Sequence, residues 1–118
     1  METHQKLEVW QKAMKLVPDI YVLTRSFPDE EKFGLTNQIR RCAVSIPSNI
    51  AEGHARKSDG DFIRFLRIAY GSSAELETQL TLARELEFIS QQDFDTLMDS
   101  LTGVRMMLNK LMSSIAKS

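Results

Sequence analysis

Apolar residues recur every three or four positions along almost the whole chain, which is the repeat of an α-helix that buries one face. Four such stretches predict helices over residues 7–26, 35–52, 59–86 and 91–116. The last stretch is close to a heptad repeat. No stretch of convincing length alternates apolar and polar residues as a strand would. The pattern therefore predicts an all-α fold.

Three short breaks separate the predicted helices. The first break contains proline and glycine. In the second, Gly53 suits the end of one helix and Ser58 suits the N-cap of the next. Ser90 with Asp93 three residues later resembles a capping box. Because short connections force neighbouring helices to be antiparallel, we expect an up-down-up-down four-helix bundle. Pro18, inside the first predicted helix, predicts a kink or a locally broken turn.

Length and composition are those of an ordinary globular domain. The 118 residues, 42% hydrophobic and 26% charged, suit one domain over residues 1–118 and exclude a disordered chain. The single cysteine excludes an intrachain disulfide. The N-terminus lacks the apolar core of a signal peptide, and no apolar run approaches the ~20 residues of a membrane helix. We therefore expect a cytoplasmic protein with no membrane partner.

No set of catalytic or metal-binding residues can be assembled from the sequence. A di-iron bundle needs Glu-x-x-His pairs, and neither His4 nor His54 has a glutamate three positions before it. Cys42 lies on the apolar stripe of the second predicted helix, where a small buried hydrophobe is expected rather than a nucleophile. We expect no enzyme activity, no metal and no cofactor.

One charged residue interrupts an apolar stripe. Arg105 lies between Leu101 and Leu108 on the last predicted helix. Antiparallel pairing places it opposite residues 73–77, where Glu77 is the nearest carboxylate. A buried ion pair between Arg105 and Glu77 is one interpretation. The other is that the arginine extends along the stripe to solvent.

A second apolar face predicts self-association. It runs along the side of the third predicted helix opposite the core and along a neighbouring face of the second. Its candidate interface residues are Val44, Ala51, Ile68, Gly71, Glu75 and Leu82. Helices that are apolar on two faces are usually buried on both, which favours an oligomer over a monomer. A mid-helix glycine costs about 1 kcal/mol relative to alanine, so we expect a partner to approach closely at Gly71.

Charge is distributed unevenly, although the net charge is only −1. Between residues 40 and 67 the basic side chains outnumber the acidic ones, and they are Arg40, Arg41, Arg56, Lys57, Arg64 and Arg67. Residues 75–99 are strongly acidic, with Arg84 as their one basic residue. The basic residues could bind the phosphates of RNA or DNA, or could pair with the acidic region of the same or a neighbouring subunit. Ordinary solvated helix faces are the third reading.

Several motifs resemble one known family. The most specific is Ile-Pro-Ser-Asn-Ile-Ala-Glu-Gly at 46–53, preceded by Gln-Ile-Arg-Arg at 38–41 and followed by Gly-Ser-Ser-Ala-Glu-Leu-Glu-Thr-Gln-Leu at 71–80. Together with Leu-Glu-Val-Trp at 7–10, these motifs cover nearly the whole chain. They resemble the four-helix bundle family of proteins encoded in intervening sequences of bacterial 23S ribosomal RNA genes.

The resemblance implies an assembly and leaves the activity open. It implies a homopentameric ring, similar to the accessory variability protein of diversity-generating retroelements. That relative acts beside a reverse transcriptase and binds nucleic acid through a basic surface. For the branch associated with ribosomal RNA genes the resemblance implies no established biochemical activity, because the ribosomal label reflects gene location. The expected partners are therefore further copies of the chain, with RNA, DNA or another protein as candidates.

Overall fold

Four long helices make up the structure, a computed structural model that describes residues 3–117. They are α1 (Glu8–Thr24), α2 (Leu35–Ala55), α3 (Asp59–Glu85) and α4 (Gln91–Ala116), with short 3-10 turns η1 (His4–Lys6) and η2 (Asp29–Glu31). The described residues contain no strand. The all-α, four-helix class expected from the apolar periodicity is confirmed.

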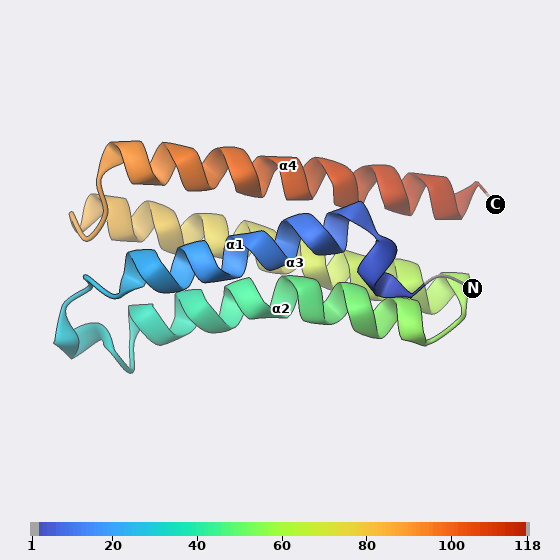
Figure 1. The fold of residues 1–118 in the computed structure, drawn as a ribbon, viewed down its shortest axis with the longest axis horizontal. Coiled ribbons are helices and arrows are strands. Elements are labelled where there is room, and N and C mark those ends of the chain that lie inside the picture. The colour runs from blue at the N-terminus through green and yellow to red at the C-terminus, as the bar shows by residue number, and fades with distance from the viewer. Residues whose placement is uncertain (1–2, 118) are drawn as a thin grey trace.

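The four helices lie side by side along one long axis (Figure 1). The connections from α1 to α2 and from α3 to α4 lie at one end of the molecule, and the connection from α2 to α3 lies at the other. The molecule measures 46 × 23 × 20 Å. Helix α2 packs most extensively against α3, whereas the seam between α1 and α4 is looser.

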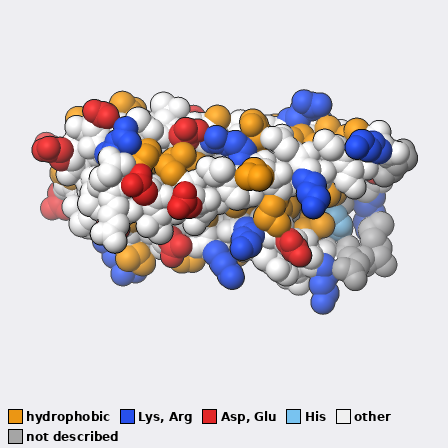
Figure 2. Space-filling model, turned by 90° about the horizontal axis from the view of Figure 1, so that it is seen from above, with side chains coloured by type: hydrophobic (Ala, Val, Ile, Leu, Met, Phe, Trp, Pro, Cys, Tyr) orange, Lys and Arg blue, Asp and Glu red, His pale blue; other side chains and the backbone are white. Residues whose placement is uncertain are grey.

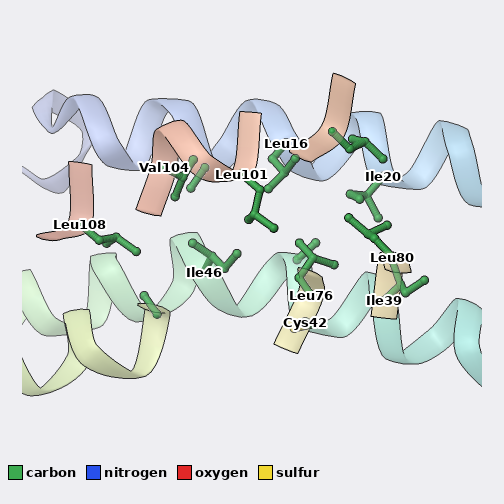
Figure 3. Close-up of a cluster of buried hydrophobic side chains, with 14 of the residues drawn as sticks. Leu16, Ile20, Ile39, Cys42, Ile46, Leu76, Leu80, Leu101, Val104 and Leu108 are labelled. Carbon is green, nitrogen blue, oxygen red and sulfur yellow. The ribbon is translucent and has the colours of Figure 1, made fainter. Parts of the chain in front are cut away.

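Side chains from all four helices meet along this axis and form the core (Figure 3). The labelled side chains are Leu16, Ile20, Ile39, Cys42, Ile46, Leu76, Leu80, Leu101, Val104 and Leu108. Nearly all of them are fully buried. Burying a leucine or isoleucine stabilises the folded state by about 1.5–3 kcal/mol relative to leaving it exposed. The apolar stripes therefore fix which face of each helix turns inward.

Helices α3 and α4 begin at the two serines that the sequence predicts as N-caps. Ser58 Oγ accepts a hydrogen bond from the backbone N–H of Asp61 at 3.2 Å, and Ser90 Oγ accepts one from Asp93 at 3.0 Å. Each bond satisfies a backbone donor that the helix itself cannot pair, which is typically worth about 1 kcal/mol. Both cap predictions are confirmed.

The expected helix end at Gly53 is wrong. Helix α2 continues to Ala55, and Gly53 is buried within it. A Cβ atom at this position would lie 2.6 Å from Cβ of Phe65 and 3.2 Å from Cδ1 of Phe62. The glycine is therefore present because α2 and α3 approach each other closely here, and the helix does not end at it.

Pro18 does not break α1. The helix runs without interruption from Glu8 to Thr24, so the broken turn expected from the proline is absent. Pro18 lies on an exposed side of the helix. Solvent can therefore hydrate the carbonyl group that the proline leaves without a backbone donor.

Candidate interaction surfaces

An apolar groove runs along the outer seam between α1 and α2. Its volume is about 420 Å³. The residues that line it include Trp10, Met14, Pro18, Val44, Pro47 and Ala51. Met14 and Val44 are 42% and 38% exposed. Two of the candidate interface residues, Val44 and Ala51, therefore belong to this α1–α2 groove.

The other four candidate interface residues lie on α3. Ile68 and Leu82 are 43% and 50% exposed. A Cβ atom at Gly71 would meet nothing within 4 Å, so this glycine serves no close packing inside the subunit. Glu75 lines a separate groove on the side of α2 that faces α3. The six residues therefore form two surfaces on opposite flanks of α2, the α1–α2 groove and what we call the α3 face (Ile68, Gly71, Glu75 and Leu82).

The groove between α2 and α3 is polar, and the sequence interpretation did not find it. It has a volume of about 500 Å³. Its lining consists of Asn37, Gln38, Arg41, Cys42, Ser45, Glu75 and Gln79. Beside it, Ser45 Oγ donates a hydrogen bond to Ser72 Oγ. These short polar side chains join α2 to α3. In the sequence, the serines at positions 45 and 72 were the feature from which this polar contact could have been predicted.

Cys42 is held as a protonated thiol at this seam. Its Sγ donates to the carbonyl oxygen of Ser72 at 3.0 Å and lies 3.5 Å from Oε1 of Glu75. Burial and the negative charge of Glu75 raise the pKa of the Cys42 thiol to about 12. A thiol with this pKa is almost entirely protonated at neutral pH, and only the thiolate is a good nucleophile.

Arg40, one of the six basic candidates, is engaged with α1. Its Nε donates to Thr24 Oγ1 at 2.8 Å, and its Nη2 donates to the carbonyl oxygen of Tyr21 at 3.2 Å. Its guanidinium also lies 4.6 Å from the centre of the Tyr21 ring. Arg40 therefore joins α2 to α1 inside the subunit.

Arg56 and Arg64 are also paired, each with an acid on its own helix. Arg56 lies 2.9 Å from Glu52, and Arg64 lies 3.4 Å from Asp61. Both guanidinium groups lie over the Phe65 ring. These are exposed pairs, which contribute little to stability and can exchange partners. Neither arginine pairs with the acidic 75–99 region of the same subunit.

The remaining basic candidates differ in their surroundings. Arg41 and Arg67 are exposed, and neither forms a hydrogen bond or ion pair with another residue between 3 and 117. Lys57 occupies the turn between α2 and α3, where its φ of 60° is left-handed. The six basic candidates thus do not form one continuous row of available cations, because Arg40 is hydrogen-bonded to α1.

Charge is instead segregated along the long axis. The end that holds the α1–α2 and α3–α4 connections carries Asp29, Glu30, Glu31, Glu85, Glu87, Asp93 and Asp95, against Arg25, Lys32 and Arg84. We call it the acidic end. The opposite, basic end carries Lys6, Arg56, Lys57, Arg64, Lys110 and Lys117, against Glu8, Glu52, Asp59 and Asp61. Figure 2 looks down on α4. Most of the acidic side chains visible in this view lie toward the left, at the end that holds the α1–α2 and α3–α4 connections.

Arg105 and Glu77 do meet, but the pair is only half-buried. Arg105 Nη2 lies 2.9 Å from Oε1 of Glu77, and the two side chains are 21% and 43% exposed. The arginine also donates from Nε to Ser73 Oγ at 3.1 Å and from Nη2 to the Ser73 carbonyl oxygen at 3.0 Å. The guanidinium therefore crosses from α4 to the polar edge of α3. It is neither fully buried nor extended into solvent.

Residues 3–117 bring no three His, Cys, Asp or Glu side chains together as ligands for a metal ion. Among the same residues, none of the helices has the length and apolar character needed to cross a bilayer. The features that stand out are the apolar groove, the α3 face, the polar groove and the two charged ends. All of them lie on the surface of the molecule.

Comparison with known proteins identifies the family. The model of the 23S rRNA-intervening sequence protein family matches residues 5–110. The chain belongs to this family. The family expected from the motifs is thereby confirmed.

A solved structure supports the same fold. It is a protein with unknown function from the S23 ribosomal protein family of Bacteroides thetaiotaomicron, similar to this chain with a TM-score of 0.82 and 27% identity. The similarity covers 88% of this chain and 97% of the other. No curated protein matches the chain. Membership in the intervening-sequence family therefore gives the fold and assigns no activity.

Proposed function

We propose that the chain is a non-enzymatic, self-assembling module, in which antiparallel up-down-up-down bundles join into a closed homo-oligomer. The observation that carries the proposal is the presence of two different exposed apolar surfaces, the α1–α2 groove and the α3 face, on opposite flanks of α2. A contact between two different surfaces is heterologous, and such contacts form a ring when the rotation between neighbours closes. The family resemblance favours five subunits.

The chemistry of the two surfaces supports their pairing. The groove is lined mainly by apolar side chains, and the α3 face offers Ile68 and Leu82, each about half exposed. Covering the exposed half of such a side chain contributes about 1 kcal/mol, so several together can hold a subunit contact. Gly71, which has open space around it in one subunit, would allow the neighbouring copy to approach the α3 backbone.

The proposal is tested by two variants that each damage one surface. Val44→Asp places a charge in the groove and Ile68→Asp places one on the α3 face, so each variant alone should be unable to form the ring. Mixed together they should associate through this contact, because each retains the surface that the other lacks. Val22→Asp is the matched control, since Val22 is 58% exposed and lies outside both surfaces. Variants that assemble like the wild type, or fail to associate when mixed, would exclude this contact.

Phosphate binding by the basic end is a second candidate function, favoured by the segregation of charge along the axis. A ring would repeat the basic end in every subunit, which raises the effective affinity for a long polyanion. Such binding is sequence-independent and weakens steeply with salt, because each neutralised phosphate releases condensed counterions. The alternative is a structural or protein-interaction module that binds no nucleic acid.

Fluorescence anisotropy with labelled RNA and DNA, single- and double-stranded, decides between these alternatives. We expect binding in ~50 mM salt that is lost as the salt concentration rises. Arg56→Glu with Lys57→Glu should weaken it, whereas Lys32→Glu at the acidic end should not. No binding by the wild type in ~50 mM salt would reject the nucleic-acid candidate and leave the protein-interaction module.

A further inference from the structure

The outward face of α4 carries an ordered pattern that neither proposed surface uses. Along this face, three or four positions apart, lie exposed residues that include Gln92, Asp99, Gly103, Met106, Lys110 and Lys117. Met106 is 66% exposed, which is unusual for a large apolar side chain in the middle of a helix. Asp99 and Lys110 form no hydrogen bond or ion pair with any other residue in the described chain. The face thus runs from acidic through apolar to basic.

The pattern is symmetric about the point between Val104 and Arg105. Gly103 and Met106 are equally far from this point, and so are Asp99 and Lys110. Gln92 and Lys117 are a third such pair. When a helix packs antiparallel on its own copy, every residue meets the residue at the mirrored position, so Asp99 would meet Lys110 and Gly103 would meet Met106.

The centre of the pattern is shaped for close contact. A Cβ atom at Gly103 would meet nothing within 4 Å, so the helix surface is open at this position. Met106 is the most exposed large hydrophobic side chain on α4, and it lies one turn from that opening. Helices pack 8–10 Å apart when the side chains of one enter the grooves of the other. A flexible methionine over a glycine suits the short end of this range.

We propose that two copies of the chain pair through this face, with their α4 helices antiparallel about a two-fold axis. Met106 of each copy packs over Gly103 of the other, and Asp99 of each contacts Lys110 of the other. A two-fold contact uses the same surface on both copies, so each of these pairs occurs twice. The acidic and basic halves of α4 also attract in this orientation and repel in the parallel one, which selects the antiparallel register.

This contact is separate from the ring proposed above. It uses α4, whereas the ring contact uses the α1–α2 groove and the α3 face. The two can therefore be tested one at a time. With the ring contact blocked by Val44→Asp, the expected species is a dimer with twice the chain mass of 13.5 kDa.

Charge exchange across the axis is the decisive test. In the Val44→Asp background, Asp99→Lys creates two Lys–Lys contacts and Lys110→Glu creates two Asp–Glu contacts, so each should weaken the dimer about tenfold or more. The double variant Asp99→Lys with Lys110→Glu restores opposite charges and should recover the dimer. Lys12→Glu, an exposed lysine on α1, is the control and should leave the mass unchanged.

Gly103→Leu separates loss of pairing from loss of folding. A Cβ atom here meets nothing within 4 Å and leucine favours the helix over glycine, so in the Val44→Asp background the melting temperature should rise. The same side chain fills the position of the partner's Met106, so sedimentation of the Val44→Asp chain with Gly103→Leu should show only the single chain. A Val44→Asp chain that is monomeric throughout, a dimer unaffected by Gly103→Leu, or a double charge variant that remains dissociated would each overturn the proposal.

Discussion

Arg105→Ala is expected to lower the free energy of unfolding by about 2 kcal/mol, with most of the loss coming from Ser73 rather than from Glu77. The guanidinium makes two hydrogen bonds to Ser73, at 3.1 and 3.0 Å, and one ion pair to Glu77 at 2.9 Å. Ser73 is completely buried, whereas the Glu77 side chain is 43% exposed. Water can therefore replace the arginine at Glu77 but not at Ser73.

The magnitude follows from these exposures. Hydrogen bonds to charged groups contribute about 1.5–3 kcal/mol when they are protected from solvent, and two that share one buried serine contribute less than twice that amount. An ion pair with a carboxylate this exposed contributes under about 1 kcal/mol after solvent screening. A fully buried pair would cost about 3–5 kcal/mol to break, so the half-buried position predicts the smaller figure.

Double-mutant cycles measured by urea unfolding test this division. Ser73→Ala removes the hydrogen bond to Oγ and leaves the one to the backbone carbonyl oxygen. Arg105→Ala combined with Ser73→Ala should still show a larger coupling energy than Arg105→Ala combined with Glu77→Ala. Raising the salt concentration should reduce only the second coupling, because exposed charges are screened. A coupling to Glu77 of about 3 kcal/mol or more would show that the ion pair behaves as a buried one, and a loss for Arg105→Ala below about 0.5 kcal/mol would show that the arginine behaves as a surface residue.

Three further changes test the packing of α2, the end of α3 and the seam thiol. Gly53→Ala should lower the free energy of unfolding in urea by about 1–3 kcal/mol, because the alanine Cβ would lie 2.6 Å from Cβ of Phe65 and α2 and α3 must separate. A gain in stability would contradict the close approach of these two helices. Glu87→Gly should stabilise the fold by about 0.5–1 kcal/mol in thermal unfolding, since Glu87 follows the end of α3 with a φ of 62°, a conformation that favours glycine. No gain in stability would show that glutamate adopts this conformation at no cost. Cys42 should contribute to pH dependence, because its pKa is raised from 9.0 to about 12 in the folded state. Its protonated form stabilises the fold fully below pH 9, and this contribution is lost as the pH rises toward 12. Cys42→Ala should flatten that alkaline decline, and an unchanged pH profile would exclude the thiol as its source.

Periodicity was enough to predict the four helices, because the buried stripe of each is long and regular. Ser58 and Ser90 were also predictable as helix caps, since a cap depends on local sequence alone. Gly53 was misread because a glycine that ends a helix and a glycine that permits close packing look alike in sequence. Only the position of Phe65 on the neighbouring helix distinguishes them.

The surfaces were harder to predict than the core. The approximate register between α3 and α4 was enough to bring Arg105 near Glu77, but its burial depends on how far the side chains reach beyond the stripe. Arg40 shows a different difficulty, because Thr24 and Tyr21 become its partners only after α1 packs against α2. Charge counted along the sequence pointed to a basic segment, whereas the fold gathers charge at the two ends of the molecule.

Sedimentation equilibrium of the wild-type chain over a wide range of concentrations tests whether the protein self-assembles. We expect a mass that is a multiple of 13.5 kDa, with five subunits in the ring favoured by the family resemblance, and a loss of that ring in Val44→Asp and in Ile68→Asp. A single species of 13.5 kDa at every concentration would contradict it.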